Sequence, residues 1–368
     1  MKIKMSHSVN GVEVFWVTTP LDAPVSDSSF TIRNSGMVVV RVTTDSGLSG
    51  YGTTFSVALA EYMHKTLKPV VMGKDPICVE DIWNDMRGAV RSAGRKGLAL
   101  LAISTLDIAL WDLRGKILGL PIYKLLGGSK RFIPVYASGG WLSYSMEQTL
   151  EEARKNVADG YSVIKIKIGA DGGRNLRADV KKVEAVRGAV GDDVDLIVDA
   201  NGIWDPATAI RFAQMVKDCN VSLFEEPVDA DDIPGLRRVR EATSMPVATG
   251  ENEYTKYGMR DLALGQAVDV VQFDITRTGG FTEMQKISAI AQAWNLKLAP
   301  HAWEFISAHL MSVAPNALYQ EKLSIQERIF KKAIFDYPLP KNGVYEIPDK
   351  PGLGVEFDLD FLQKNNQL

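Results

Sequence analysis

Eight short apolar segments follow one another between residues 133 and 321, and an amphipathic, helix-like stretch separates each from the next. The expected strands are 134–140, 162–169, 194–201, 222–227, 245–251, 267–280, 296–301 and 316–321, with helices expected near 145–159, 174–190, 206–219, 232–243, 255–264, 281–294 and 304–313. Strands that alternate regularly with helices form a parallel sheet, and eight such units close into a barrel. The sequence therefore predicts an α/β fold with a TIM-type (β/α)8 barrel over residues 131–330.

The residues before the predicted barrel have a different sequence pattern. The stretch "MVVVRVTTDSGLSGYG" at 37–52 is typical of a β-hairpin, and "GLALLAISTLDIALWDLRGKILGL" at 97–120 repeats apolar residues at helical spacing. Residues 1–130 are thus predicted to form an α+β capping domain. The tail at 331–368 contains many prolines and glycines, and we expect it to return to the capping domain.

Composition argues against several classes of partner. The 368 residues carry a formal net charge of −3, which leaves no basic excess for nucleic acid or an anionic membrane surface. No segment approaches the roughly 18 apolar residues of a membrane span, and the first residues lack the apolar core of a signal peptide. Two cysteines far apart in the chain, Cys78 and Cys219, are typical of a reducing compartment, so we expect a cytoplasmic protein.

Ionisable side chains fall at the carboxyl ends of seven consecutive predicted strands, where a parallel barrel places its chemistry. In chain order they are Lys165 with Lys167, then Asp199, Glu225, Glu251, Asp274, His301 and Glu321. Carboxylates on three successive strands, Asp199, Glu225 and Glu251, would repel one another unless a cation binds between them. Hard oxygen ligands without cysteine or histidine favour Mg2+ over zinc, so we predict one Mg2+ site in each subunit.

Two bases flank this predicted metal site. Lys167 and His301 belong to the second and seventh strands, so they can address opposite faces of one substrate atom. We expect Asp274 to hold the imidazole of His301 in one tautomer. Lys165 is expected to lower the pKa of Lys167 by like-charge repulsion, or to contact the substrate carboxylate. The pattern indicates abstraction of the proton next to a carboxylate, through a metal-stabilised enediolate.

Each of these residues also has a structural alternative. A lone acid at a strand end is often a helix cap or a solvated loop residue, and one of the adjacent Glu225 and Glu226 can simply face solvent. A histidine before an apolar helix, such as His301, is commonly structural, and His309 inside that helix is interpreted as structural. Glu321 is expected to donate a short hydrogen bond if it stays protonated. The joint pattern favours a catalytic site because chance rarely aligns so many ionisable groups.

These residues resemble the mandelate racemase subgroup of the enolase superfamily over nearly the whole chain. The stretch "IKIKIG" is similar to the Lys-x-Lys motif of that subgroup, and "VDAN", "FEEP" and "ATGE" are similar to its three Mg2+ ligand motifs. Asp274 with His301 in "LAPH" resembles its Asp–His dyad, and Glu321 falls where the family keeps a glutamate. The resemblance implies a barrel mouth covered by the capping domain and the tail. The muconate lactonising subgroup is less similar because it carries a lysine where this chain has Asp274.

The resemblance implies one of two reactions on a small carboxylic acid. A dehydratase removes the α-proton while His301 protonates a departing β-hydroxyl, which converts an aldarate or aldonate into a 2-keto-3-deoxy acid. A racemase instead moves the α-proton between Lys167 and His301. The stretches "YASGGWL" and "AGRKGLALLAISTLDIALWD" are similar to galactarate and talarate dehydratases, whereas "EFISAHLMSVAPNALYQE" is similar to mandelate racemase. We predict an acid-sugar dehydratase, a hydro-lyase, with a racemase as the alternative and a non-catalytic acid-binding protein as a remote one.

The choice of substrate is expected to lie in the lid. The loop "LDAPVSDSSFTIRNSG" at 21–36 offers polar groups for hydroxyls or a distal carboxylate, namely Ser26, Asp27, Ser28, Ser29 and Arg33, although solvated loops are also polar. Arg95 and Lys96 in "SAGRKG" are further candidates for a second carboxylate, and Asn201 is a candidate for substrate contact. We also expect a homo-oligomer.

Overall fold

A computed structural model describes residues 7–92 and 94–368. Its first part is an antiparallel sheet in the order β1 (Val9–Ser26), β2 (Thr31–Thr44) and β3 (Ser49–Thr54). The helices that follow are α1 (Leu59–Tyr62), the π-helix η1 (Met63–Leu67), α2 (Lys68–Val71), α3 (Val79–Ala89), α4 (Leu98–Leu118) and α5 (Ile122–Leu125). The predicted hairpin at 37–52 is confirmed as the β2–β3 pair.

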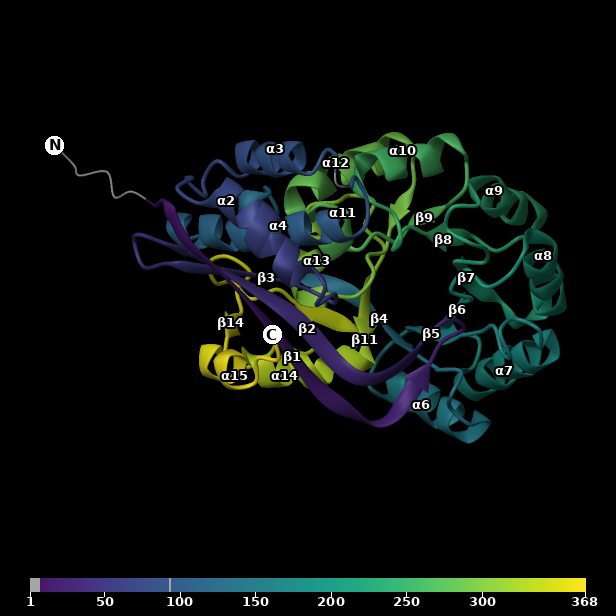
Figure 1. Cartoon of the computed structure of the whole chain (residues 1–368). Helices are drawn as coiled ribbons and strands as arrows, with labels where there is room; N and C mark the ends of the chain where they lie inside the picture. Colours follow the sequence, from purple (N-terminus) through teal and green to yellow (C-terminus); the bar gives the residue numbers. More distant parts are fainter. Residues whose placement is uncertain (1–6, 93) are drawn as a thin grey trace.

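The second part is the barrel, seen on the right of Figure 1. Its strands are β4 (Phe132–Gly139), β5 (Val163–Lys167), β6 (Asp195–Asp199), β7 (Val221–Glu225), β8 (Val247–Thr249), β9 (Val270–Val271), β10 (Lys297–Leu298) and β11 (Gln320–Leu323). Neighbouring strands are parallel, β11 pairs with β4, and a parallel bridge between Leu298 and Ala317 closes the ring. The predicted α/β fold, a TIM-like barrel with an α+β capping part, is confirmed.

Helices connect the barrel strands in sequence. They are α6 (Met146–Ala158), α7 (Leu176–Val190), α8 (Pro206–Met215) with η2 (Lys217–Cys219), α9 (Ile233–Ala242), α10 (Thr255–Leu264), α11 (Ile275–Thr278), α12 (Gly280–Ala293) and α13 (Glu304–Met311). The sixth strand is much shorter than the predicted 267–280. Asp274 accepts a hydrogen bond from the Thr276 N–H and so caps α11, which ends the extended backbone early. The eighth strand begins at Gln320 rather than at 316.

The tail consists of η3 (Ser324–Gln326), α14 (Glu327–Ala333), β12 (Ile334–Phe335), β13 (Val344–Glu346), β14 (Glu356–Phe357) and α15 (Leu359–Lys364). The Gln367 N–H donates to the carbonyl of Trp16 at 2.9 Å, so the chain end contacts β1. The tail also contributes a strand that the sequence did not indicate, because β13 pairs antiparallel with β4. It therefore joins the capping sheet to the barrel.

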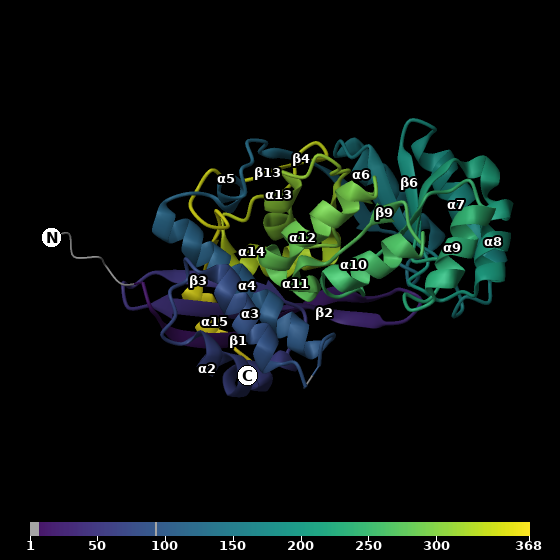
Figure 2. The same cartoon turned by 90° about the horizontal axis from the view of Figure 1, so that it is seen from above.

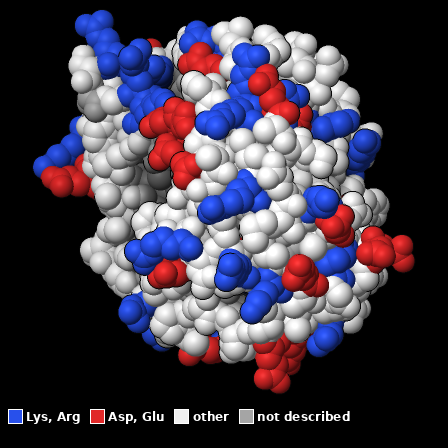
Figure 3. Space-filling model, turned by 90° about the vertical axis from the view of Figure 1, so that its right-hand side faces the viewer, with Lys and Arg blue, Asp and Glu red and all other residues white. Residues whose placement is uncertain are grey.

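The long β1–β2 hairpin extends from the capping helices across to the barrel (Figures 1 and 2). Its tip is docked there, because the Ser28 hydroxyl donates to the Ala200 carbonyl at 2.9 Å and the Leu142 N–H donates to the Ser26 carbonyl at 2.8 Å. On the face drawn in Figure 3, acidic and basic side chains are interspersed over the outer barrel helices. Within the described residues, no helix is both long and apolar enough to cross a membrane.

Strand β3 lies so close to α4 that only glycine fits at Gly52. A Cβ atom there would stand 1.9 Å from the Thr105 carbonyl oxygen. We expect Gly52→Ala to lower the free energy of unfolding by at least about 2 kcal/mol, because the helix and strand must separate. Gly88→Ala is the matched control: Gly88 lies in α3 with no atom near its missing Cβ, so this change should stabilise by about 0.5–1 kcal/mol. Urea unfolding measures both, and equal effects would contradict the close-packing argument.

Candidate active site

The side chains of strand β5 point alternately toward the barrel axis and toward the surrounding helices. Ile164, Ile166 and Ile168 belong to the large outer core, whereas Val163 belongs to a small cluster inside the barrel. Side chains alternate along a strand, so Lys165 and Lys167 follow Val163 on the inner face. Lys165 is 2% exposed and Lys167 is 6% exposed. The two ammonium groups therefore enter the barrel above its apolar floor.

The two lysines pair with carboxylates from other strands. The Lys165 ammonium contacts Glu225, lies 2.8 Å from Glu321 Oε1 and lies 3.4 Å from Asp199 Oδ2. The Lys167 ammonium is 2.5 Å from Asp199 Oδ2. Buried charges persist only when they are paired. The lysines and acids predicted at separate strand ends thus form one ionic cluster.

Two predicted protonation states are wrong for the protein chain alone. Burial would lower the pKa of Lys167 and Lys165 lowers it further, but the carboxylates of Asp199, Glu225 and Glu251 together outweigh both effects and raise it. Burial would raise the pKa of Glu321, yet the ammonium of Lys165 holds it at about 2. Glu321 is therefore ionised and accepts hydrogen bonds, including one from the Ala302 N–H at 2.8 Å, instead of donating one.

His301 and Asp274 form a close pair on the opposite wall. Nδ1 of His301 lies 2.8 Å from Asp274 Oδ2, and the other oxygen of Asp274 accepts from the backbone and hydroxyl of Thr276, both at 2.7 Å. Burial would lower the pKa of His301, but the carboxylates of Glu251 and Asp274 raise it. With Nδ1 engaged by Asp274, Nε2 is the atom left to exchange a proton with a substrate.

The acids predicted as metal ligands lie on adjacent strands at one height. Asp199 and Glu225 are register partners in β6 and β7, and Glu251 comes two residues after the end of β8. Glu226 is also buried, at 3% exposed, so the expectation that one of the two neighbouring glutamates faces solvent is wrong. Burial and the nearby Glu251 carboxylate raise the pKa of Glu226 to about 8.

These carboxylates fit a magnesium ion by the chemistry of their donor atoms. All are hard oxygen donors. Burial raises the pKa of Glu225, and the neighbouring Asp199 carboxylate raises it further. Within residues 7–92 and 94–368, however, no three His, Cys, Asp or Glu side chains stand in a metal-holding arrangement. The oxygens of Asp199 and Glu225 are instead taken by Lys165, Lys167 and the amide of Gln272. A bound cation therefore has to displace these partners.

The cluster opens into a cavity of about 400 Å3 between the barrel mouth and the hairpin. From the barrel it is lined by Trp141, Lys167, Asn201, Glu226, Glu251, Asn252, Arg277, His301, Glu321, Leu323, Ile325 and Gln326. From the capping part it is lined by Trp16, Asp27, Ser29, Phe30, Ile32, Asn34, Ser35, Gly36 and Phe55. The structure thus brings Asn201, predicted to contact substrate, to the same cavity as Lys167 and His301.

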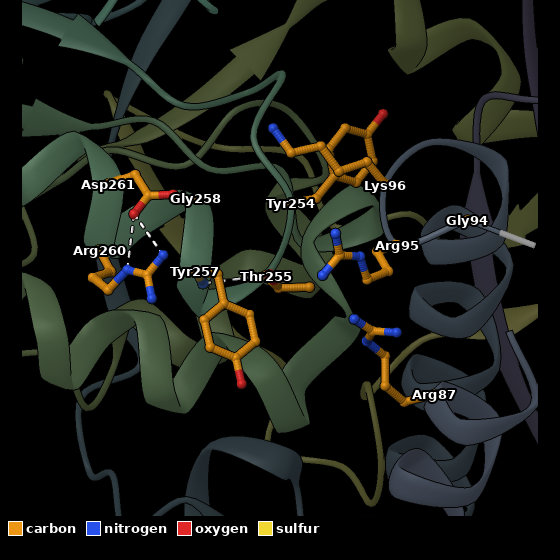
Figure 4. Close-up of a pocket in the computed structure, with 10 residues that line it drawn as sticks. All are labelled: Arg87, Gly94, Arg95, Lys96, Tyr254, Thr255, Tyr257, Gly258, Arg260 and Asp261. Carbon is orange, nitrogen blue, oxygen red and sulfur yellow. Dashed lines mark hydrogen bonds and ion pairs between the residues drawn. The ribbon is translucent and has the colours of Figure 1, made fainter. Parts of the chain in front are cut away.

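Other predicted lid residues lie elsewhere. The Ser26 hydroxyl bonds to Thr31 within the hairpin, and Ser26 does not line the cavity. Arg33 is exposed and does not line the cavity, although its neighbours Ile32 and Asn34 do. Arg95 and Lys96 line a separate and larger cavity of about 850 Å3 (Figure 4).

The sequence reasoning missed several residues of this site. Arg277 lies 3.3 Å from Glu251 and 3.5 Å from Asp274, and so links the metal-ligand candidate to the dyad. Gln272 donates its amide to Glu225. Their signal was present in "QFDITR", where Gln272 stands two residues before Asp274 and Arg277 three residues after it. The aromatic wall made by Trp16, Phe55 and Trp141 had no local signal.

Comparisons with known proteins find family matches for both parts of the chain. Residues 10–127 match the family described as "Mandelate racemase / muconate lactonizing enzyme, N-terminal domain", and residues 148–361 match "Enolase C-terminal domain-like". The arabinonate dehydratase of Saccharolobus solfataricus is 34% identical over 335 residues, which cover 86% of this chain and 87% of that protein.

Solved structures are also similar over the whole length. A racemase from Streptomyces coelicolor with bound magnesium has a TM-score of 0.91 and 30% identity, covering 97% of this chain and 99% of its own. A second similar structure is a variant of L-talarate/galactarate dehydratase, solved with magnesium and L-glucarate. The enzyme of this name from Salmonella typhimurium has also been solved. The variant has a TM-score of 0.90 and 30% identity, covering 100% of this chain and 94% of its own.

Proposed function

The chain belongs to the mandelate racemase/muconate lactonizing enzyme family of enolase-like proteins, and on that premise we propose that it is a magnesium-dependent acid-sugar dehydratase. The observation that carries the proposal is the placement of Lys167 and the His301–Asp274 pair on the walls of one cavity. Strands β5 and β10 are separated by β4 and β11 on one side and by four strands on the other. A substrate between them meets proton-transfer groups from two directions.

In the proposed reaction Lys167 is neutral because its partner Asp199 is then engaged by a cation, and its amine takes the proton from the carbon next to the carboxylate. The electron pair left behind forms the C2–C3 double bond while the C3–O bond breaks, and His301 gives its proton to the departing hydroxyl, which leaves as water. The resulting enol becomes a 2-keto-3-deoxy acid. Asp274 orients the imidazole of His301 and stabilises its charged form.

Asp199, Glu225 and Glu251 are the residues proposed to hold magnesium. When bound, the ion offsets negative charge on the substrate carboxylate as the α-proton leaves. Lys165, with its ammonium among Glu225, Glu321 and Asp199, adds a second positive charge at the same end. Asn201 is proposed to contact the substrate, and Glu321 to accept hydrogen bonds at the cavity wall.

The lid supports a substrate with one carboxylate rather than two. Among the residues that the structure describes, those that the capping part contributes to the cavity are apolar or neutral apart from Asp27, and none is a lysine or arginine. Asp27 itself accepts from the N–H groups of Ser29 and Phe30, both at 2.7 Å, which fixes the hairpin tip. A second carboxylate at this end would find no cation and would face the charge of Asp27, whereas sugar hydroxyls match Ser29 and Asn34.

We expect an aldonate to be converted with a kcat/KM at least about tenfold higher than the aldarate of the same length and stereochemistry, a difference of about 1.4 kcal/mol. A panel of such matched acids, assayed for 2-keto acid with magnesium, measures this ratio. Asn34→Lys, which adds a cation to the cavity, should shift the ratio toward aldarates. Arg33→Ala, at a neighbouring residue that does not line the cavity, should leave it unchanged.

The outcomes of this panel separate the substrate class from the reaction. If only aldarates react, the dehydratase proposal stands and the single-carboxylate inference is wrong. A racemase is favoured if no acid yields a keto product while an α-hydroxy acid exchanges its α-proton in D2O. The structural similarity to the magnesium-bound racemase makes this the second candidate. A protein that binds acids without any exchange would be a non-catalytic receptor.

A further inference from the structure

A second cavity is larger than the proposed active site. It has a volume of about 850 Å3 and lies between the capping part and the barrel helix α10 (Figure 4). Four cationic side chains line it: Arg87 in the last turn of α3, Arg95 and Lys96 in the segment before α4, and Arg260 on α10. Cationic side chains from both the capping part and the barrel therefore line one cavity.

Few acids balance these cations. Arg260 pairs with Asp261 at 2.7 Å, and Lys96 lies 3.6 Å from Glu253. In the part of the chain that the structure describes, Arg87 and Arg95 have no acidic group within 4 Å. Figure 4 shows both guanidinium groups turned into the cavity. Like charges repel, so this convergence costs stability unless an anion binds there.

The remaining walls suit an anion with more than one acceptor oxygen. Tyr254 and Tyr257 supply phenol groups and ring faces, and the first turn of α10 lines the cavity next to them. Guanidinium groups bind phosphate oxygens in pairs. The arginine cluster and the tyrosines occur on one concave surface, unlike scattered surface charge.

We propose that this cavity binds a phosphate-bearing small molecule that bridges the capping part and the barrel. Arg87 and Arg95 donate hydrogen bonds to the phosphate oxygens, and Lys96 and Arg260 add positive charge at the rim of the cavity. The site is distinct from the catalytic cavity, because none of its lining residues lines that cavity. Ligand binding there links α3 to α10 and therefore stabilises the folded chain.

Isothermal titration calorimetry of the full chain with pyrophosphate and ATP, at 150 mM KCl, tests the proposal. We expect saturable binding of at least one of them and a rise in the melting temperature at the same concentrations. The double variant R87A/R95A should weaken binding at least about tenfold, since two charge-assisted contacts are lost. Arg91→Ala is the matched control, because Arg91 belongs to the same segment but does not line the cavity.

Two results would overturn the proposal. One is the absence of saturable binding by both probes. If R87A/R95A then also changes the sedimentation of the protein, the cations contact a second copy of the chain instead. The other is binding that Arg91→Ala weakens as much as R87A/R95A does, which would mean general attraction to positive surface. Because the readout is binding, neither result depends on the proposed dehydratase activity.

Discussion

Replacing Lys167 by arginine is expected to reduce kcat at least about 10³-fold while the protein still folds. Arginine keeps the positive charge beside Asp199, which at 2.5 Å from the lysine ammonium would otherwise be a buried, unpaired carboxylate. Its guanidinium cannot lose a proton near neutral pH, so it cannot take one from the substrate. Loss of general-base catalysis typically costs 10²- to 10⁴-fold.

His301→Asn should be as damaging to dehydration but should differ in one measurement. Lys167 remains in this variant, so the α-proton of the substrate should still exchange in D2O although no water is eliminated. Lys155→Ala and His64→Asn are matched controls, because both side chains are exposed and lie outside the cavity. Melting temperatures verify folding. A Lys167→Arg enzyme with more than a tenth of the wild-type kcat would remove Lys167 as the base.

The positions of the site residues along the chain were predictable because two regular rules apply. Strands alternate their side chains, and parallel barrels gather the carboxyl ends of their strands at one mouth. Lys165, Lys167, Asp199 and Glu225 therefore needed only a correct strand assignment. Asp274 reaches the site although strand β9 ends at Val271, because it caps the helix that follows closely after the strand.

What could not be predicted depends on contacts between distant segments. Arg95 stands in a connecting segment whose direction is set by the packing of α3 and α4, and it lines the larger cavity instead of the catalytic one. The pKa of Lys167 depended on the 2.5 Å approach of Asp199, which strand order alone does not specify. The docking of Ser28 on the Ala200 carbonyl likewise joins residues more than 170 positions apart.

The second large effect concerns the metal. Chelation with EDTA is expected to abolish turnover, and added Mg2+ should restore it. Asp199, Glu225, Glu226 and Glu251 are crowded carboxylates whose charge the two lysines only partly offset. A divalent cation relieves this repulsion and binds only the folded chain, so saturating Mg2+ should also raise the melting temperature. This readout does not require a substrate.

Glu251→Gln should weaken Mg2+ at least about tenfold, measured by calorimetry, because it replaces a charged donor with a neutral one. Glu253→Gln is the matched control, since the side chain of Glu253 is 10% exposed, against 12% for Glu251, but faces Lys96. Equal Mg2+ affinity in the two variants would exclude Glu251 as a ligand. Glu251 also contacts Arg277 and lies 3.6 Å from His301 Nε2, so a wild-type affinity with lost activity would instead assign it to the dyad.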